Sequence, residues 1–207
     1  MIVYPLALPA AAIASVSVRL VTRAAGSRSP FSGLQQVHVW PAGWWEAEVE
    51  YMPMPDRETA EDVVGWLAAL NGRQGSFLMG DPLYAVPRGT WAGASPTVNG
   101  AGQTGLTLAV AGLAAGATAR RGDRFQLGAG ATARLHMVTA DATASGAGQV
   151  TLSIWPRLRA SPANGAGLTL AAPLGRWMLA DDVSEYSVTR AATYGVSISC
   201  VEDLRPT

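Results

Sequence analysis

The sequence predicts a mainly β protein: a discontinuous β-sandwich-like core with one α-helix, carrying an inserted small all-β barrel or sandwich domain. Three observations lead to this fold class. Apolar and polar residues alternate along several runs near both ends of the chain, as they do in half-buried strands. One segment has apolar residues at helical spacing. The middle of the chain, residues 91–175, is rich in Ala, Gly and Thr and has no helix-length pattern.

The first part of the chain is expected to be extended. Alternation predicts a strand over residues 13–23, and Gly, Ser and Pro predict a loop over residues 24–33. Residues 34–43 and 44–54 are predicted as two further extended runs, separated by a turn at Pro41-Ala42-Gly43. The clearest strand pattern is the alternation of apolar residues with glutamates in the second of these runs: Trp45, Ala47, Val49 and Tyr51 against Glu46, Glu48 and Glu50.

One helix is predicted. Thr59 is expected to cap its start, with Asp62 three residues later in an approximate capping box. Asn71-Gly72 supplies a left-handed stop, and a strand over residues 75–80 follows. The apolar stripe of this helix is interpreted as core and not as a cofactor site; it consists of Val63, Trp66, Leu67 and Leu70.

The middle segment repeats a short phrase. It reads NGAGQTGLTL at 99–108, SGAGQVTLSI at 145–154 and NGAGLTL at 164–170, each a Gly-rich turn followed by an alternating strand. The spacing is irregular, so a solenoid is not predicted. Short strands joined by such turns indicate a small antiparallel barrel or sandwich.

Charge marks the same boundaries. Residues 1–90 carry a net −2, residues 91–175 a net +4 and residues 176–207 a net −2. The last segment again has strand-like alternation. We therefore predict one discontinuous core domain, residues 1–90 plus 176–207, with strand pairing between its two parts, and an inserted domain over residues 91–175.

Composition excludes several classes of function. The net charge is zero, with 15 basic and 15 acidic residues, whereas DNA-binding proteins usually carry a basic excess. No run of about 20 apolar residues is available for membrane insertion. Residues 6–18 are apolar, but no basic residue precedes them and Pro9 interrupts them, so we expect them to belong to the fold and not to a cleaved signal. A neutral chain suits a protein that is assembled with partners.

Enzyme signatures are missing from the sequence. It has no GxSxG, Walker or helix-opening GxGxxG motif. The one cysteine, Cys200, is predicted to be a buried, inert thiol, and His38 and His136 have no metal-ligand spacing. Asp123 and Asp141 could form a carboxylate pair, but turn-forming roles are commoner. We expect no catalysis, no cofactor and no metal.

One of these aspartates also ends an Arg121-Gly122-Asp123 tripeptide, which matches an integrin-type motif. Such triplets are frequent by chance, and a turn is the better interpretation.

Arginines and tryptophans are the remaining candidates. The arginines of the middle segment are candidate inter-subunit contacts, and we predict that at least two of them reach acids on another chain; the alternatives are a solvated face or nucleic acid passing nearby. They are Arg120, Arg121, Arg124, Arg134, Arg157 and Arg159. The seven tryptophans could form a carbohydrate platform, but core or subunit-interface positions are favoured, with Trp40, Trp44, Trp45 and Trp66 in core-type patterns.

The order of motifs resembles a known family. Ser29-Pro30, Gly33 and Gln36 precede a Trp-bearing strand, and the helix region ends in Leu70, Gly72, Gly75 and Phe77. This arrangement resembles distal tail proteins and related minor tail proteins of long-tailed, siphovirus-like bacteriophages. The phrases RRGDRFQLG (120–128) and YGVSISCVEDL (194–204) add to the likeness, which covers nearly the whole chain.

The resemblance implies a structural virion protein, made in the host cytoplasm, that forms a ring, commonly six-fold. Such a ring, a baseplate hub component, joins the tail tube protein to the tail hub or tip proteins. Some relatives carry sugar-binding modules, so the alternative is a module that recognises a host-surface carbohydrate. A tail-associated enzyme is the weakest alternative, because the sequence offers no convincing carboxylate or Cys/His pair.

Overall fold

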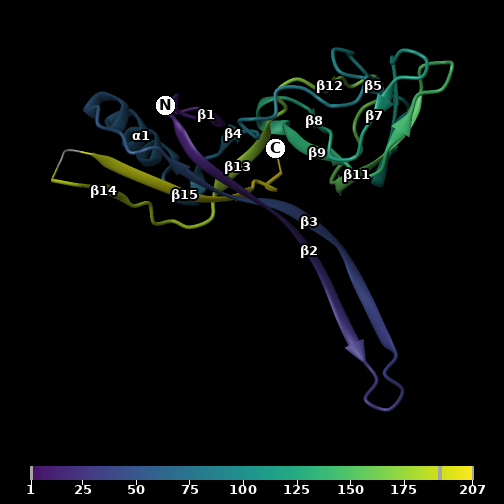
Figure 1. Ribbon diagram of the computed structural model, residues 1–207, viewed down its shortest axis with the longest axis horizontal. Helices are drawn as coiled ribbons and strands as arrows, with labels where there is room; N and C mark the ends of the chain where they lie inside the picture. The colour runs from purple at the N-terminus through teal and green to yellow at the C-terminus, as the bar shows by residue number, and fades with distance from the viewer. Residues whose placement is uncertain (1, 191–192, 207) are drawn as a thin grey trace.

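The fold is mainly β with one α-helix among the described residues, which are 2–190 and 193–206 of this computed structural model, so the predicted fold class is confirmed. Met1, residues 191–192 and Thr207, which the predicted core domain includes, lie outside the described residues. Two large sheets and a separate two-stranded pair form the described part of the molecule, and a long two-stranded hairpin of the first sheet projects from it (Figure 1).

The first sheet has the strand order β1-β4-β13-β15-β3-β2, with β14 also paired to β15. Its strands come from both ends of the chain: β1 (Leu6–Ala7), β2 (Ile13–Arg28), β3 (Gln35–Tyr51), β4 (Phe77–Met79), β13 (Gly175–Leu179), β14 (Tyr186–Val188) and β15 (Tyr194–Glu202). The helix α1 (Arg57–Leu70) and the 3-10 turn η1 (Gly72–Gln74) lie between β3 and β4 in the chain. Ile198 on β15 lies opposite Val49 on β3, and Trp177 on β13 lies opposite Phe77 on β4. The expected strand pairing between the two outer segments is therefore present.

The second sheet, with the order β12-β8-β9-β11-β6-β5, forms a nearly closed barrel within residues 91–175, called the insert below. Its elements, with the separate β7–β10 pair, are β5 (Thr97–Val98), β6 (Gly105–Ala111), β7 (Thr118–Ala119), β8 (Arg124–Leu127), the 3-10 turn η2 (Gly130–Thr132), β9 (Arg134–Val138), β10 (Ala142–Thr143), β11 (Val150–Leu158) and β12 (Leu168–Thr169). A bridge between Thr97 and Gly167 links the two ends of this sheet.

The buried apolar residues form two clusters, one for each sheet. The first gathers Trp45, Val49 and Phe77 with residues of α1 and β15, and the second gathers Trp91, Phe125 and other residues of the insert. Leu135 of the insert belongs to the first cluster, so the two cores meet along β9. Independent folding of residues 91–175 stays a prediction.

The strand pattern of β3 is confirmed. Trp45, Ala47, Val49 and Tyr51 are buried, while Glu48 and Glu50 are exposed on the other face. The alternation continues across the ladder, because Cys200 and Ile198 of β15 face the same core. The apolar set therefore fixes the register of β3 against β15.

The helix begins earlier than predicted. Asp56, not Thr59, is its N-cap, and the Asp56 carboxylate accepts hydrogen bonds from the backbone amides of Glu58 and Thr59. A carboxylate at this position satisfies the free amides and also complements the helix dipole. The predicted stop is confirmed, since Asn71 has a left-handed φ of 51°.

The predicted core stripe of α1 is mostly buried. Val63, Leu67 and Leu70 are buried, and the half-buried Trp66 packs edge-to-face on Phe77 at 5.1 Å between ring centroids. None of the helices in the described part of the chain has the length and hydropathy needed to cross a membrane.

The hairpin β2–β3 corrects two predictions. Residues 24–28, predicted as part of a loop, continue β2, and the predicted turn at Pro41-Ala42-Gly43 lies inside the continuous strand β3. Thr22 pairs with Gly43 and Ala24 pairs with Val39, so Arg23 alone opposes three residues in a bulge. Pro41, which has no N–H to donate, is tolerated there because a bulge leaves residues unpaired.

Candidate functional site

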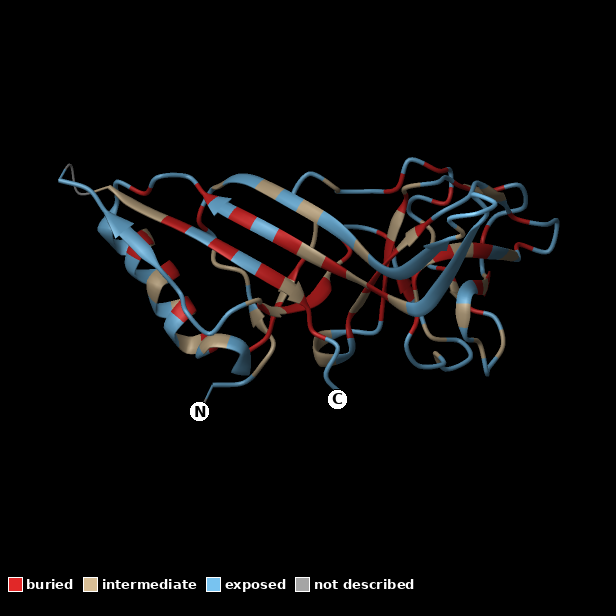
Figure 2. Cartoon of the chain, turned by 90° about the horizontal axis from the view of Figure 1, so that it is seen from below, coloured by how far each residue is buried: buried red, intermediate tan, exposed pale blue. Residues whose placement is uncertain are grey.

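The most prominent surface feature is the outer part of this hairpin, residues 22–42, which we call the arm. It extends away from both cores, and nearly all of it is exposed (Figures 1 and 2). Phe31 at its tip is 98% exposed. An isolated two-stranded hairpin is at best marginally stable in water. An arm of this length is therefore typical of a segment that packs against another protein.

One face of the arm is apolar. Directly opposite residues of an antiparallel pair share a face, and Val39 lies opposite Ala24 while Val37 lies opposite Gly26. We call the face that these four residues form the arm strip. Val39 is 65% exposed and Val37 is 58% exposed. On the other face His38 and Trp40 meet edge-to-face at 4.8 Å.

Trp40, for which the sequence favours a core or subunit-interface position, does not lie in the core, since it is 46% exposed on the arm; its place at a subunit interface stays a prediction. Phe31, Val37 and Val39 were not predicted from the sequence as functional candidates. Residues alternate in character on both sides of Pro41, which is a strand pattern. Pro41 and Gly43, however, indicate a turn, so a single long strand was not predicted.

The arm is also basic. It carries Arg23 and Arg28 and no acidic residue. Arg23 lies over the Trp44 ring at 5.1 Å, and Arg28 donates to the carbonyl of Gly33. The core domain as a whole has a net charge of −4, so its surface outside the arm is acidic. The arm of one copy and the core of another are therefore complementary in charge.

The six candidate arginines do not form one patch. Arg124 forms an ion pair with Asp81 and lies over the Tyr84 ring at 5.5 Å. Its guanidinium is thus engaged within the chain, where it ties the insert to the segment after β4. A contact of Arg124 with another chain would compete with this ion pair.

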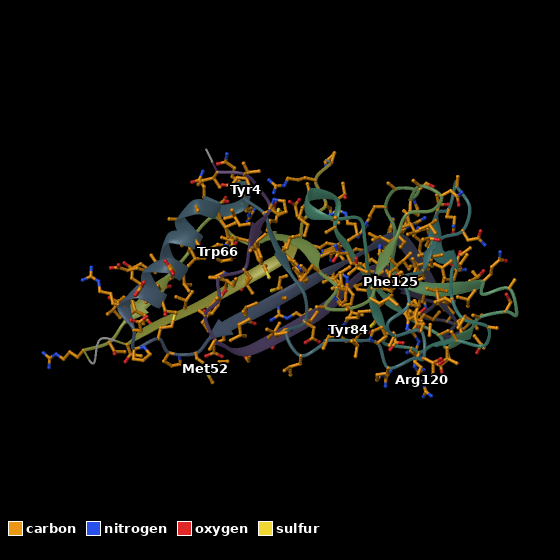
Figure 3. All side chains as sticks on the ribbon, turned by 90° about the horizontal axis from the view of Figure 1, so that it is seen from above. Tyr4, Met52, Trp66, Tyr84, Arg120 and Phe125 are labelled. Carbon is orange, nitrogen blue, oxygen red and sulfur yellow. The ribbon has the colours of Figure 1, made fainter. Side chains whose placement is uncertain are left out.

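Arg120 and Arg121 lie on an exposed turn of the insert, and Figure 3 shows Arg120 on the outside of the insert with Phe125 within it. Arg157 is half-buried on β11 and forms no ion pair with the described residues. Contact of these three side chains with another chain stays a prediction.

Arg134 and Arg159, by contrast, converge on one cavity. It has a volume of about 700 Å³ and lies between the insert and the segment 204–206. Arg134 donates to the carbonyl of Asp203, and Arg159 donates to the carbonyl of Gly43 at the base of the arm. Neighbouring strands β9 and β11 bring these two arginines together.

Asp123 has a structural role. Its carboxylate is fully buried and accepts hydrogen bonds from the backbone amides of Gly89 and Arg120 and from the Trp91 indole at 2.8 Å. Asp141 accepts from the amide of Arg121 at 2.7 Å. Both aspartates therefore stabilise turns, which is the role that the sequence favours for them. Because Asp123 is fully buried, the Arg121-Gly122-Asp123 tripeptide is not presented to a receptor.

Cys200 and His136 are held in unreactive states. Burial raises the pKa of Cys200 to about 12, so the thiol stays protonated. Burial lowers the pKa of His136 to about 4, and its Nδ1 donates to the carbonyl of Pro156 at 2.8 Å. Within residues 2–190 and 193–206, no group of three His, Cys, Asp or Glu side chains is arranged to hold a metal ion.

The aromatic residues of the insert are not exposed. Trp91 and Phe125 are fully buried, and Trp155 is half-buried, edge-to-face against Trp45 at 4.6 Å. Sugar-binding platforms need exposed rings, so within the described residues the insert offers no such platform.

Comparison with models of known protein families finds no match, and a search of curated proteins finds no match either.

Proposed function

We propose that this chain is a structural component of the tail tip of a long-tailed bacteriophage, a distal tail protein whose copies form a closed ring, six-fold as is common in the family it resembles. The ring would join the tail tube protein to the tail hub or tip proteins, and the chain would reside in the virion after synthesis in the host cytoplasm. The order of sequence motifs supports the family, and the exposed arm supports assembly from copies of one chain.

The exposed arm is the main structural support for the proposal that copies of the chain form a ring. It is a projecting element with an uncovered apolar face, while the rest of the molecule has its own two cores. If the arm of each copy lies on the core of the next, the contact is head-to-tail, and head-to-tail contacts close into rings when the rotation allows. Burial of Val37 and Val39 would contribute about 1.5–3 kcal/mol each.

Charge would set the orientation of this contact. Arg23 and Arg28 of the arm would face the acidic surface of the neighbouring core. Exposed ion pairs contribute about 0–1 kcal/mol each, so they guide association more than they hold it. The proposal includes no catalysis, no cofactor and no sequence-specific binding of nucleic acid.

The alternative function, recognition of a host-surface carbohydrate, has less support. It depends on exposed aromatic rings on the insert, and the three aromatic residues of the insert are buried or half-buried. The basic turn at Arg120 and Arg121 is compatible with either function and does not separate them.

The test is the mass of the purified protein by sedimentation velocity, for the natural chain and two variants. Val37→Ser/Val39→Ser removes the two large side chains of the arm strip. Leu106→Ser is the control, because this leucine is 57% exposed and lies on the insert, outside both the arm and the core domain. We expect a ring for the natural chain and the control, and a folded monomer, checked by circular dichroism, for the arm variant. A monomeric natural chain, or an arm variant that still forms the ring, would refute the proposal.

A further inference from the structure

The cavity beside Arg134 lies where three parts of the chain meet. Its lining comes from the end of β8 and from β9, from the segment that follows β11, and from residues 204–206. A volume of about 700 Å³ is within the range of small-ligand sites, which is about 300–1,000 Å³. The arm and its strip contribute no residue to this lining.

The floor of the cavity is apolar. Leu127 and Leu158 are buried beneath it, and Pro162 and Ala166 form part of the wall. His136, which also lines the floor, is stacked on Phe125 with its ring uncharged. Such a surface favours an apolar body over a fully hydrated one.

The charges at the cavity are all positive. Arg134, Arg159 and Arg205 line it, and no acidic side chain does so in the part of the chain that the structure describes. Arg205 is neutralised by Asp203, which it contacts at 2.7 Å. Arg159 has Glu202 at 3.8 Å, a distance too long for a hydrogen-bonded pair.

Arg134 has no carboxylate within 4.0 Å among the described residues and donates only to the Asp203 backbone carbonyl. Its side chain is half-buried. Burial and the nearby Arg176 lower its pKa, while the carboxylates of Glu202 and Asp203 act in the opposite direction. Its remaining N–H groups can donate to an anion in the cavity. Guanidinium groups bind carboxylates bidentately, which fits these donors.

We propose that the cavity binds a carboxylate carried on an apolar body, with Arg134 and Arg159 holding the carboxylate and Leu127 and Leu158 contacting the body. The carboxylate can come from a free small acid or from an acidic side chain of another protein. The inference does not depend on the ring, because the cavity is complete within one chain.

Calorimetric titration tests the proposal with octanoate as the free acid and octanamide as its neutral counterpart. A blocked five-residue peptide with glutamate between leucines, and the same peptide with glutamine, represent the second source. We expect at least one acid to bind about tenfold or more tightly than its neutral counterpart, since a charge-assisted bidentate contact is worth about 1.5–3 kcal/mol. Tighter binding of octanoate indicates a small ligand, and tighter binding of the peptide indicates a protein partner.

Three variants complete the experiment. Arg134→Gln/Arg159→Gln should abolish the preference for the acid. Arg157→Gln is the matched control, because this arginine is on β11 but does not line the cavity, and it should bind as the natural chain does. Ser161→Trp fills the cavity from an exposed position without removing an arginine, so it should also abolish binding in a normally folded protein. Failure of both acids to bind, or equal binding by Ser161→Trp, overturns the proposal while leaving the ring untouched.

Discussion

The arm and the insert use the same kind of secondary structure in opposite ways. Both consist of antiparallel strands with β-branched residues at alternate positions. In the insert, Val98, Val110 and Val138 are buried in the barrel, whereas Val37 and Val39 of the arm are uncovered. The insert therefore carries its stability within one chain, and the apolar residues of the arm gain theirs when another chain covers them.

The largest expected effect is a difference in the free energy of unfolding between a variant of the insert and a variant of the arm. Trp91 is fully buried in the insert and donates its indole N–H to Asp123. Trp91→Ala should lower the free energy of unfolding by about 3–5 kcal/mol. Val39→Ala on the arm should change it by less than about 0.5 kcal/mol in the monomer. Urea unfolding of monomeric samples measures both, and a similar loss in the two variants would break the comparison.

The second prediction contrasts the two histidines. Burial lowers the pKa of His136 in the insert to about 4, from 6.5. The folded state thus favours the neutral ring, so the stability it contributes is complete above pH 6.5 and is lost as the pH falls toward 4. We expect a loss of up to about 3 kcal/mol over this range. Arg134 and Arg159, which face the ring, add to the cost of protonation.

Chemical unfolding at a series of pH values between 7 and 4 measures this loss. His136→Gln should remove most of it, while His38→Gln, on the exposed arm, should keep it. If His136→Gln unfolds with the same pH dependence as the natural chain, the buried imidazole is not its source.

The smallest expected effect concerns Arg120 and Arg121, the exposed arginines of the insert. Arg120→Gln/Arg121→Gln should slow assembly a few-fold at low salt and have little effect at high salt, because screening weakens surface charges. Light scattering during assembly measures the rate. Unchanged rates at low salt would identify these residues as a solvated face, with assembly depending on the arm alone.

Local patterns predicted the parts of the fold that depend on local chemistry. The alternation around Val49 defined β3, and Asn71 ended the helix, because burial on one face and a left-handed residue act through near neighbours. Asp56 was missed as the cap, since Thr59 followed by Asp62 imitates the same signal one turn later. The glycine and serine of residues 24–28 indicated a loop, but pairing with residues 35–39 holds them in a strand.

The candidate sites were less accessible from sequence. Arg134 and Arg159 are 25 positions apart, and only the pairing of β9 with β11 brings them to one cavity. Asp81, the partner of Arg124, lies outside the insert, so nothing in the local sequence shows that this arginine is engaged. The charge of residues 91–175 identifies the segment as basic. Ion pairs formed in the folded chain decide which of its arginines remain available for contacts with a ligand or another chain.

The central claim, that the arm of one copy lies on the core of another, can be tested by photo-crosslinking from the arm strip. Val39→Cys supplies an accessible thiol for a benzophenone maleimide, while the buried Cys200, with its raised pKa, stays unlabelled. In the assembled protein we predict crosslinks between chains, mapped by mass spectrometry to residues 1–21, 43–90 or 176–207 of the neighbouring copy. Crosslinks confined to the same chain, to the neighbour's arm or to its insert, or none in an assembled sample, would contradict the account.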